Sequence, residues 1–122
     1  MKKNLNTIET KIVKLNVELF FWKEDAIYYA YAPALDLTGY GLSKGAAKDS
    51  FETILSEFVV YIQNKRTIFI ELEKLGWAVN KRKKKIVSPD IDEMLSDNEH
   101  FNQLFNSKEL TKSASSVNLE IS

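Results

Sequence analysis

Apolar and polar residues alternate along residues 11–22 with a period of two. The apolar members share one side of an extended chain: Val13, Leu15, Val17, Leu19 and Phe21. This period predicts a β-strand with one buried face. The polar tripeptide 23–25 is short enough for a hairpin loop, and residues 26–32, rich in tyrosine, predict a second strand. Pro33 cannot donate a ladder hydrogen bond and should end it, and residues 36–40 predict a short third strand.

The clearest helical pattern covers residues 44–64. Ser43 is a suitable N-cap, because its hydroxyl can accept from an unpaired amide of the first turn. Apolar residues recur at spacings of three and four along one face: Ala47, Phe51, Ile54, Leu55, Phe58 and Ile62. One such face covers one apolar sheet face. The sequence therefore predicts an α+β fold with a two-layer β-β-β-α core.

The second half of the chain predicts shorter elements. We expect a helix over residues 67–75 that ends at Gly76, and a hairpin with strands at 77–79 and 86–88. Further helices are expected over 90–95 and from a capping box at 96–99 through Phe105. Residues 111–116 are polar and are expected to be mobile. Alternation at Val117, Leu119 and Ile121 predicts a final strand.

The length of 122 residues favours a single domain. Within it we place a β-β-β-α core at 12–64, a helix-hairpin-helix extension at 65–110, and a polar tail with a final strand at 111–122. The chain has no cysteine, which excludes disulfides and thiol nucleophiles. No segment has the run of about 18 apolar residues that spans a membrane, and the N-terminus does not resemble a secretory signal. We therefore expect a cytoplasmic protein.

The net charge is zero, but its distribution is uneven. Residues 65–89 contain 8 basic and 2 acidic residues, a balance of +6. Residues 90–122 contain 2 basic and 7 acidic residues, a balance of −5. Two explanations remain open: the segments neutralise each other in the fold, or the basic one meets an anionic partner.

Few residues suggest catalysis. The carboxylates Glu18, Asp36, Asp49 and Glu52 have no spacing that would bring them together on a divalent metal. His100 is the only histidine, and its neighbours form no metal-binding pattern. Phosphate-binding glycine loops and hydrolase nucleophile motifs are absent. We expect a protein without catalytic activity, metal or cofactor.

One stretch resembles a known family. A strand ends in a Pro-x-Leu pattern, a glycine-bearing strand follows, and a Ser-capped helix with an early alanine comes next. The residues that carry this pattern are Tyr29, Tyr31, Pro33, Leu35, Gly39, Gly41, Ser43 and Ala47. The stretch resembles the HicB-type antitoxins over residues 12–64. We expect Pro33 to stop the strand, Leu35 to fill the layer between sheet and helix, and Gly41 to permit the turn into the helix.

The resemblance implies a partial ribonuclease-H-like fold and a function by binding. HicB-like proteins neutralise small, basic, HicA-like ribonuclease toxins, and they often form dimers. The resemblance therefore implies an antitoxin that covers the toxin's active site, and a homodimer. Acidic residues are the natural match for a basic partner, and we select Glu24, Asp25 and Asp36 with the acidic segment 90–99.

The chain also departs from the family pattern. The helix starts Ser43-Lys44-Gly45-Ala46-Ala47, whereas the family pattern is Thr-x-x-Glu-Ala, so the carboxylate of the capping box is missing. Residues 65–122 do not resemble the DNA-binding modules that many family members carry.

Two alternatives to an antitoxin remain. The first is direct nucleic-acid binding through the basic run Lys81, Arg82, Lys83, Lys84 and Lys85. Such lysines and arginines neutralise phosphates, and bases would stack on exposed aromatic residues such as Tyr28 or Tyr40. The second is a dimerising scaffold that has no toxin.

Overall fold

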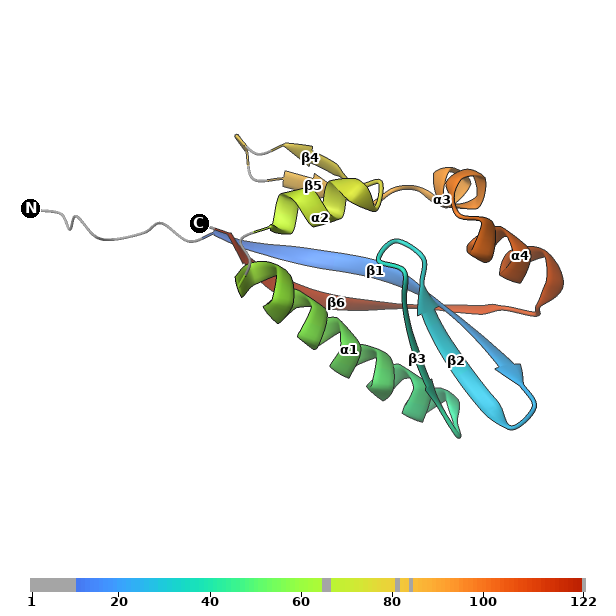
Figure 1. The fold of residues 1–122 in the computed structure, drawn as a ribbon. Coiled ribbons are helices and arrows are strands. Elements are labelled where there is room, and N and C mark those ends of the chain that lie inside the picture. The colour runs from blue at the N-terminus through green and yellow to red at the C-terminus, as the bar shows by residue number, and fades with distance from the viewer. Residues whose placement is uncertain (1–10, 65–66, 81, 84, 122) are drawn as a thin grey trace, which may run out of the picture.

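The computed structural model describes residues 11–64, 67–80, 82–83 and 85–121. Four antiparallel strands form the main sheet in the order β3-β2-β1-β6 (Figure 1). Their bounds are β1 Lys11–Glu24, β2 Ile27–Ala32, β3 Leu37–Gly41 and β6 Thr111–Ile121. Helix α1, Lys44–Asn64, follows β3 directly. The predicted β-β-β-α order and the α+β, two-layer core are confirmed.

Helix α1 lies on the face of the sheet that carries the odd-numbered residues of β1. Side chains buried from β1 on this face are Leu15, Val17, Leu19 and Phe21. For Val13 and Ile121, the structure describes only the backbone. Gly39 of β3 lies directly beneath α1, where a Cβ atom would overlap the backbone of Phe51. The absence of a side chain at Gly39 therefore lets helix and sheet approach closely.

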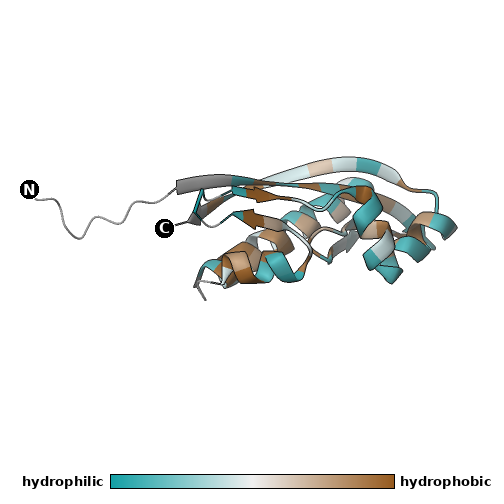
Figure 2. Cartoon of the chain, turned by 90° about the horizontal axis from the view of Figure 1, so that it is seen from above, coloured by the Kyte–Doolittle hydropathy of each residue, from teal (hydrophilic) through white to brown (hydrophobic). Residues whose placement is uncertain are grey.

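The apolar face of α1 differs from the predicted one. Its buried residues are Ala47, Phe51, Leu55, Val59 and Ile62, whereas Ile54 and Phe58 are only half-buried. The predicted stripe includes Phe58, whose ring packs against the core but is only half-buried. Val59 is buried because it continues the four-residue spacing of Ala47, Phe51 and Leu55 along one face of the helix. Apolar and polar residues alternate around the turns of α1 (Figure 2).

The opposite face of the sheet is covered at one end by the last two helices, α3 (Ile91–Asp97) and α4 (Glu99–Ser107). Phe101 of α4 is fully buried, and its ring centroid lies 5.0 Å from that of Phe20 in β1. Phe20 and Trp22 are buried on this face, while their neighbours Leu19 and Phe21 face α1. The end of β1 is thus apolar on both faces.

The segment between α1 and α3 forms α2 (Ile68–Lys74) and a small hairpin of β4 (Ala78–Asn80) and β5 (Lys85–Val87). The predicted helix and hairpin are confirmed. Gly76 follows α2 with φ of +94°, the left-handed conformation that suits a residue after a helix C-terminus. Trp77 anchors the segment, because its indole Nε1 donates a buried hydrogen bond of 2.7 Å to the Ala34 carbonyl.

The predicted final strand exists but begins earlier than expected. Strand β6 starts at Thr111 and pairs with β1 along its whole length, from Phe21 opposite Thr111 to Lys11 opposite Ile121. The prediction that residues 111–116 are a mobile polar stretch is wrong. Their polar side chains alternate in orientation, and the backbone hydrogen bonds to β1 order the segment. Within the described ranges, no helix combines the length and apolar character needed to cross a bilayer.

Candidate functional site

A recess of about 360 Å³ opens where the β2–β3 loop and the end of α2 meet helix α3 and the start of α4. Four carboxylates line it: Asp36, Glu93, Asp97 and Glu99. Lys74 from the end of α2 is the only basic residue among the described lining residues. We call this feature the acidic recess. Its walls come from three separate parts of the chain.

Asp36 is joined to the sheet by a short network of hydrogen bonds. The Tyr31 hydroxyl donates to Asp36 Oδ1 over 2.8 Å, and Asn98 Nδ2 donates to the Tyr31 oxygen over 2.9 Å. Burial raises the pKa of the Tyr31 hydroxyl; the Asn98 bond lowers it, and Asp36 raises it further. Tyr31 therefore stays neutral at physiological pH and continues to donate to Asp36.

The backbone of Asp36 adopts φ of +55°, in the left-handed region. Aspartate tolerates this region better than most residues, because its short side chain bonds locally. Leu35, just before it, is buried and donates its amide to the Ala32 carbonyl over 3.2 Å, which closes the loop tightly. The turn thus exposes the Asp36 carboxylate at the recess while Leu35 enters the core, the position that the motif predicted for it.

The helix starts position the other carboxylates. Asp90 caps α3 in a capping box with Glu93: Asp90 Oδ1 accepts from the Glu93 amide over 2.8 Å, and Glu93 Oε1 accepts from the Asp90 amide over 3.1 Å. Asn98 caps α4, with Oδ1 accepting from the Phe101 amide over 3.0 Å. The predicted capping box at 96–99 is therefore wrong, because Ser96 lies inside α3 and the cap of the next helix is Asn98.

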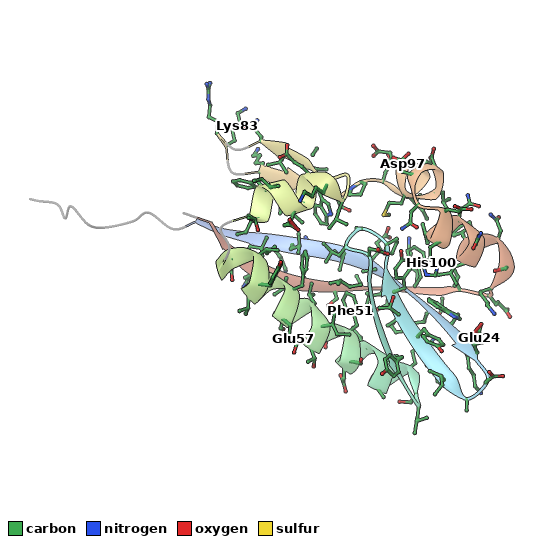
Figure 3. All side chains as sticks on the ribbon, in the orientation of Figure 1. Glu24, Phe51, Glu57, Lys83, Asp97 and His100 are labelled. Atoms are coloured by element: carbon green, nitrogen blue, oxygen red, sulfur yellow. The ribbon has the colours of Figure 1, made fainter. Side chains whose placement is uncertain are left out.

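The predicted acidic partner residues do not form one group. Asp36 lies at the acidic recess with carboxylates of the 90–99 segment. Glu24 and Asp25 lie at the β1–β2 turn, at the other end of β2, and Figure 3 shows Glu24 well apart from Asp97. Glu24 forms an ion pair of 2.6 Å with Lys108, and Asp25 occupies the turn with φ of +58°. Their placement suits the hairpin rather than a shared site.

The remaining motif residues have structural positions. Ser43 caps α1, since its Oγ accepts from the Ala46 amide over 3.0 Å, and Ala47 is fully buried. Tyr29 stacks on Trp22 with ring centroids 5.1 Å apart. Pro33 is buried just after the end of β2, the place predicted for it.

Gly41 has a different role from the predicted one. It does not form a left-handed turn; instead, a Cβ there would lie 2.7 Å from that of Ala46. The residue is needed because the first turn of α1 packs directly on the strand, which leaves no space for a side chain.

The basic run lies at the turn of the β4–β5 hairpin. Arg82 and Lys85 are exposed, and the amide of Lys83 donates to Asn80 Oδ1 over 3.1 Å. Lys83 extends away from the sheet at the end of the hairpin (Figure 3). Lys81 and Lys84 lie outside the described residues. The run is therefore on a hairpin turn, separate from the acidic recess.

The candidate catalytic residues are held in other interactions. Glu18 forms an ion pair of 2.8 Å with Lys112, and Glu52 accepts from Ser115 Oγ over 3.3 Å. His100 is exposed, and its ring packs edge-on against Tyr31 at 5.2 Å. In the part of the chain that the structure describes, no group of three or more histidine, aspartate or glutamate side chains is placed to hold a metal.

Sequence reasoning missed Asn98 and the supporting role of Tyr31. Asparagine is a common N-cap residue, so the role of Asn98 as the cap of α4 was detectable from the sequence. Its bond to Tyr31 spans 67 residues and leaves no local pattern. No protein-family model, no curated protein and no solved structure matches this chain.

Proposed function

We propose that this chain is a HicB-like antitoxin that binds a small, basic, HicA-like ribonuclease toxin and covers its active site. The observation that carries the proposal is the acidic recess, which gathers Asp36 and the carboxylates of α3 and α4 beside the HicB-like motif. A basic partner is attracted to such a surface, and charge complementarity speeds the encounter and selects the partner. Neutralisation by covering requires no chemistry from this chain.

The acidic recess is held in place before any partner arrives. Tyr31 and Asn98 orient Asp36, and the capping box orients Glu93. A preorganised site loses little side-chain entropy on binding, which favours affinity. An arginine or lysine of the toxin is the side chain that best matches four carboxylates lining one recess. The toxin's RNA substrate is cytoplasmic, so the proposal also places this chain in the cytoplasm.

Where a small basic protein is encoded beside this chain, co-expression of the pair tests the proposal directly. We expect the pair to co-purify, growth to be rescued and RNA cleavage by the partner to be suppressed. The isolated chain is expected to cleave no RNA when magnesium or manganese is supplied. If the pair neither co-purifies nor restores growth, the antitoxin function fails, and nucleic-acid binding through residues 81–85 or a dimerising scaffold replaces it.

A matched pair of double variants locates the interface. D97N/E99Q removes two charges from the acidic recess, and D49N/E57Q removes two charges from exposed positions of α1. We expect the first variant to weaken toxin binding by about tenfold or more, with most of the loss in the association rate at low salt, and the second to change it by about twofold or less. Equal losses would assign the effect to net charge and not to the recess.

A further inference from the structure

A second hollow lies at the other end of the sheet, between the first turn of α1, the end of β1 and the start of β6. It consists of two adjoining parts of about 240 and 290 Å³ that share Phe21, Lys44 and Thr111. We call it the lysine groove. It is separate from the acidic recess, with which it has no lining residue in common.

The lysine groove is positively charged. Lys23, Lys44 and Lys48 line it, and Glu109 is the only carboxylate among the described lining residues. None of these three lysines forms an ion pair within the described ranges of the chain. Lys112 also lines the groove, but its ammonium group binds Glu18 and is already neutralised. The groove thus offers three ammonium groups that form no ion pair among the described residues, a setting that selects an anion.

Aromatic rings lie beside these charges. Lys23 Nζ lies 5.4 Å from the ring centroid of the half-buried Tyr28, and Lys44 Nζ lies 5.6 Å from that of Phe21. Lys44 Nζ also donates to Thr111 Oγ1 over 2.9 Å, which holds its position at the junction of the two parts. If the base of a nucleotide stacked on the Tyr28 ring, an ammonium group of the groove would therefore be within reach of the phosphate of that nucleotide.

The two helical lysines lie in an unusual place for cations. Lys44 and Lys48 are four residues apart, so they share one side of α1, and the first turn has no acidic residue. Lys44, in that first turn, opposes the helix dipole, whereas this position ordinarily favours carboxylates. Gly45 between them faces open space, because a Cβ atom there would have only Ser43 Oγ near it, at 4.0 Å. Residues that weaken a helix locally are expected at positions where a ligand binds.

We propose that the lysine groove binds a nucleotide unit, with its phosphate between Lys44 and Lys48 and its base on the ring of Tyr28. The ligand chemistry is a phosphate next to a planar base, present in a free nucleoside monophosphate and in single-stranded RNA. This site differs from the basic run at residues 81–85, whose described residues do not line the lysine groove. Nucleotide binding in the groove does not depend on the proposed antitoxin function.

Binding of the isolated chain to AMP and to a fluorescein-labelled oligoadenylate tests the proposal by calorimetry and fluorescence anisotropy. Binding of both ligands identifies a mononucleotide site, and binding of the oligoadenylate alone identifies a strand site; either result supports the proposal. Binding of neither overturns it. Because no toxin is present, the outcome is distinguishable from that of the co-expression experiment.

Two matched pairs of variants assign the site. K44Q/K48Q should weaken binding by about tenfold or more. For the single-stranded oligoadenylate, it should also reduce the slope of log affinity against log salt concentration by about 1.4. R82Q/K83Q, with the same charge change, should alter the affinity by about twofold or less. Y28A should weaken binding by about tenfold, and Y40A, which alters a ring 63% exposed outside the groove, should not.

Three results contradict the assignment. Loss of binding in R82Q/K83Q but not in K44Q/K48Q would place the ligand at the β4–β5 hairpin. Loss in K44Q/K48Q without loss in Y28A would reduce the site to one for anions and overturn the nucleotide. Equal loss in Y28A and Y40A would show that the base does not use this groove. Circular dichroism of each variant confirms that it is folded before its affinity is compared.

Discussion

The hydroxyl of Tyr31 donates a 2.8 Å hydrogen bond to Asp36 Oδ1, joining the centre of β2 to the acidic recess. Tyr31 is only 1% exposed, and its oxygen also accepts from Asn98. The Y31F variant keeps the ring but leaves the Asn98 amide without this acceptor. We expect it to lose about 1–2 kcal/mol of unfolding free energy, measured by urea denaturation. Y40F, at an exposed ring, should change stability by less than about 0.5 kcal/mol.

The same tyrosine predicts a loss of stability at alkaline pH. The pKa of the Tyr31 hydroxyl is raised by burial, so the folded state retains the proton after the unfolded chain has lost it. In the unfolded chain a tyrosine ionises near pH 10. Below that pH the Tyr31 hydroxyl makes its full contribution to the unfolding free energy. As the pH rises above about 10, this contribution falls by at most about 1.4 kcal/mol per pH unit. Unfolding free energies of wild type and Y31F should therefore differ by a constant amount below about pH 10 and converge above it. Parallel curves would contradict this.

The helix phase predicts a contrast between two phenylalanines of α1. Phe51 is fully buried against the sheet, and Figure 3 shows Glu57 on the outer side of the same helix. Phe51→Ala should cost about 3–5 kcal/mol, because a large cavity is left in the core. Phe58→Ala should cost clearly less, since Phe58 is half-buried, and Glu57→Ala should stay within about 0.5 kcal/mol. Equal denaturation midpoints for the two phenylalanine variants would show that the phase is wrong.

Two glycines near α1 should respond to alanine in opposite directions. Gly39→Ala places a methyl group against the backbone of Phe51 and must separate helix and sheet, so we expect a loss of about 2 kcal/mol or more. Gly45→Ala meets open space in a helical turn and should gain about 0.5–1 kcal/mol. Thermal denaturation of both variants checks the pair. A stable Gly39→Ala protein would refute the close approach.

The edges of the sheet predict the form of a homodimer. Strands β3 and β6 are the two edges, and on β3 the Tyr40 amide already donates to Ser50 Oγ over 3.2 Å. Strand β6 is the longer edge, with 11 residues, and we predict that two copies pair along it. Static light scattering at micromolar concentration should give twice the chain mass of 14.0 kDa. A strict monomer, or β6 amides whose hydrogen exchange does not slow with concentration, would contradict the dimer.

Much of the fold could be predicted because its signals are local. The two-residue period of β1, the helical spacing after Ser43 and the glycine at position 76 each depend on neighbours a few residues away. These patterns predicted β1, β2, β3, α1 and α2, together with the hairpin that carries the basic run. Ser43 was recognised as a cap for the same reason, since an N-cap bonds within its own first turn.

The candidate sites were less predictable, because they depend on residues far apart in the chain. Asp36 meets Asp97 and Glu99 only when α3 and α4 fold back on the sheet. Tyr31 and Asn98 are 67 residues apart, and their bond has no counterpart in local pattern. The lysine groove was also missed, although Lys44 in the first turn of α1, with Lys48 one turn later, was a visible signal against the helix dipole.

The sequence by itself determined the identity and order of the first strands and helix, because backbone periodicity and capping act over a few residues. Tertiary structure alone decided that Phe20 is buried beneath Phe101, that Val59 rather than Phe58 completes the core, and that the polar start of β6 is a strand. Each of these results follows from packing or pairing with a distant partner. The physical reason is that burial and ladder hydrogen bonds depend on which surfaces meet, and chain-distant surfaces meet only in the folded molecule.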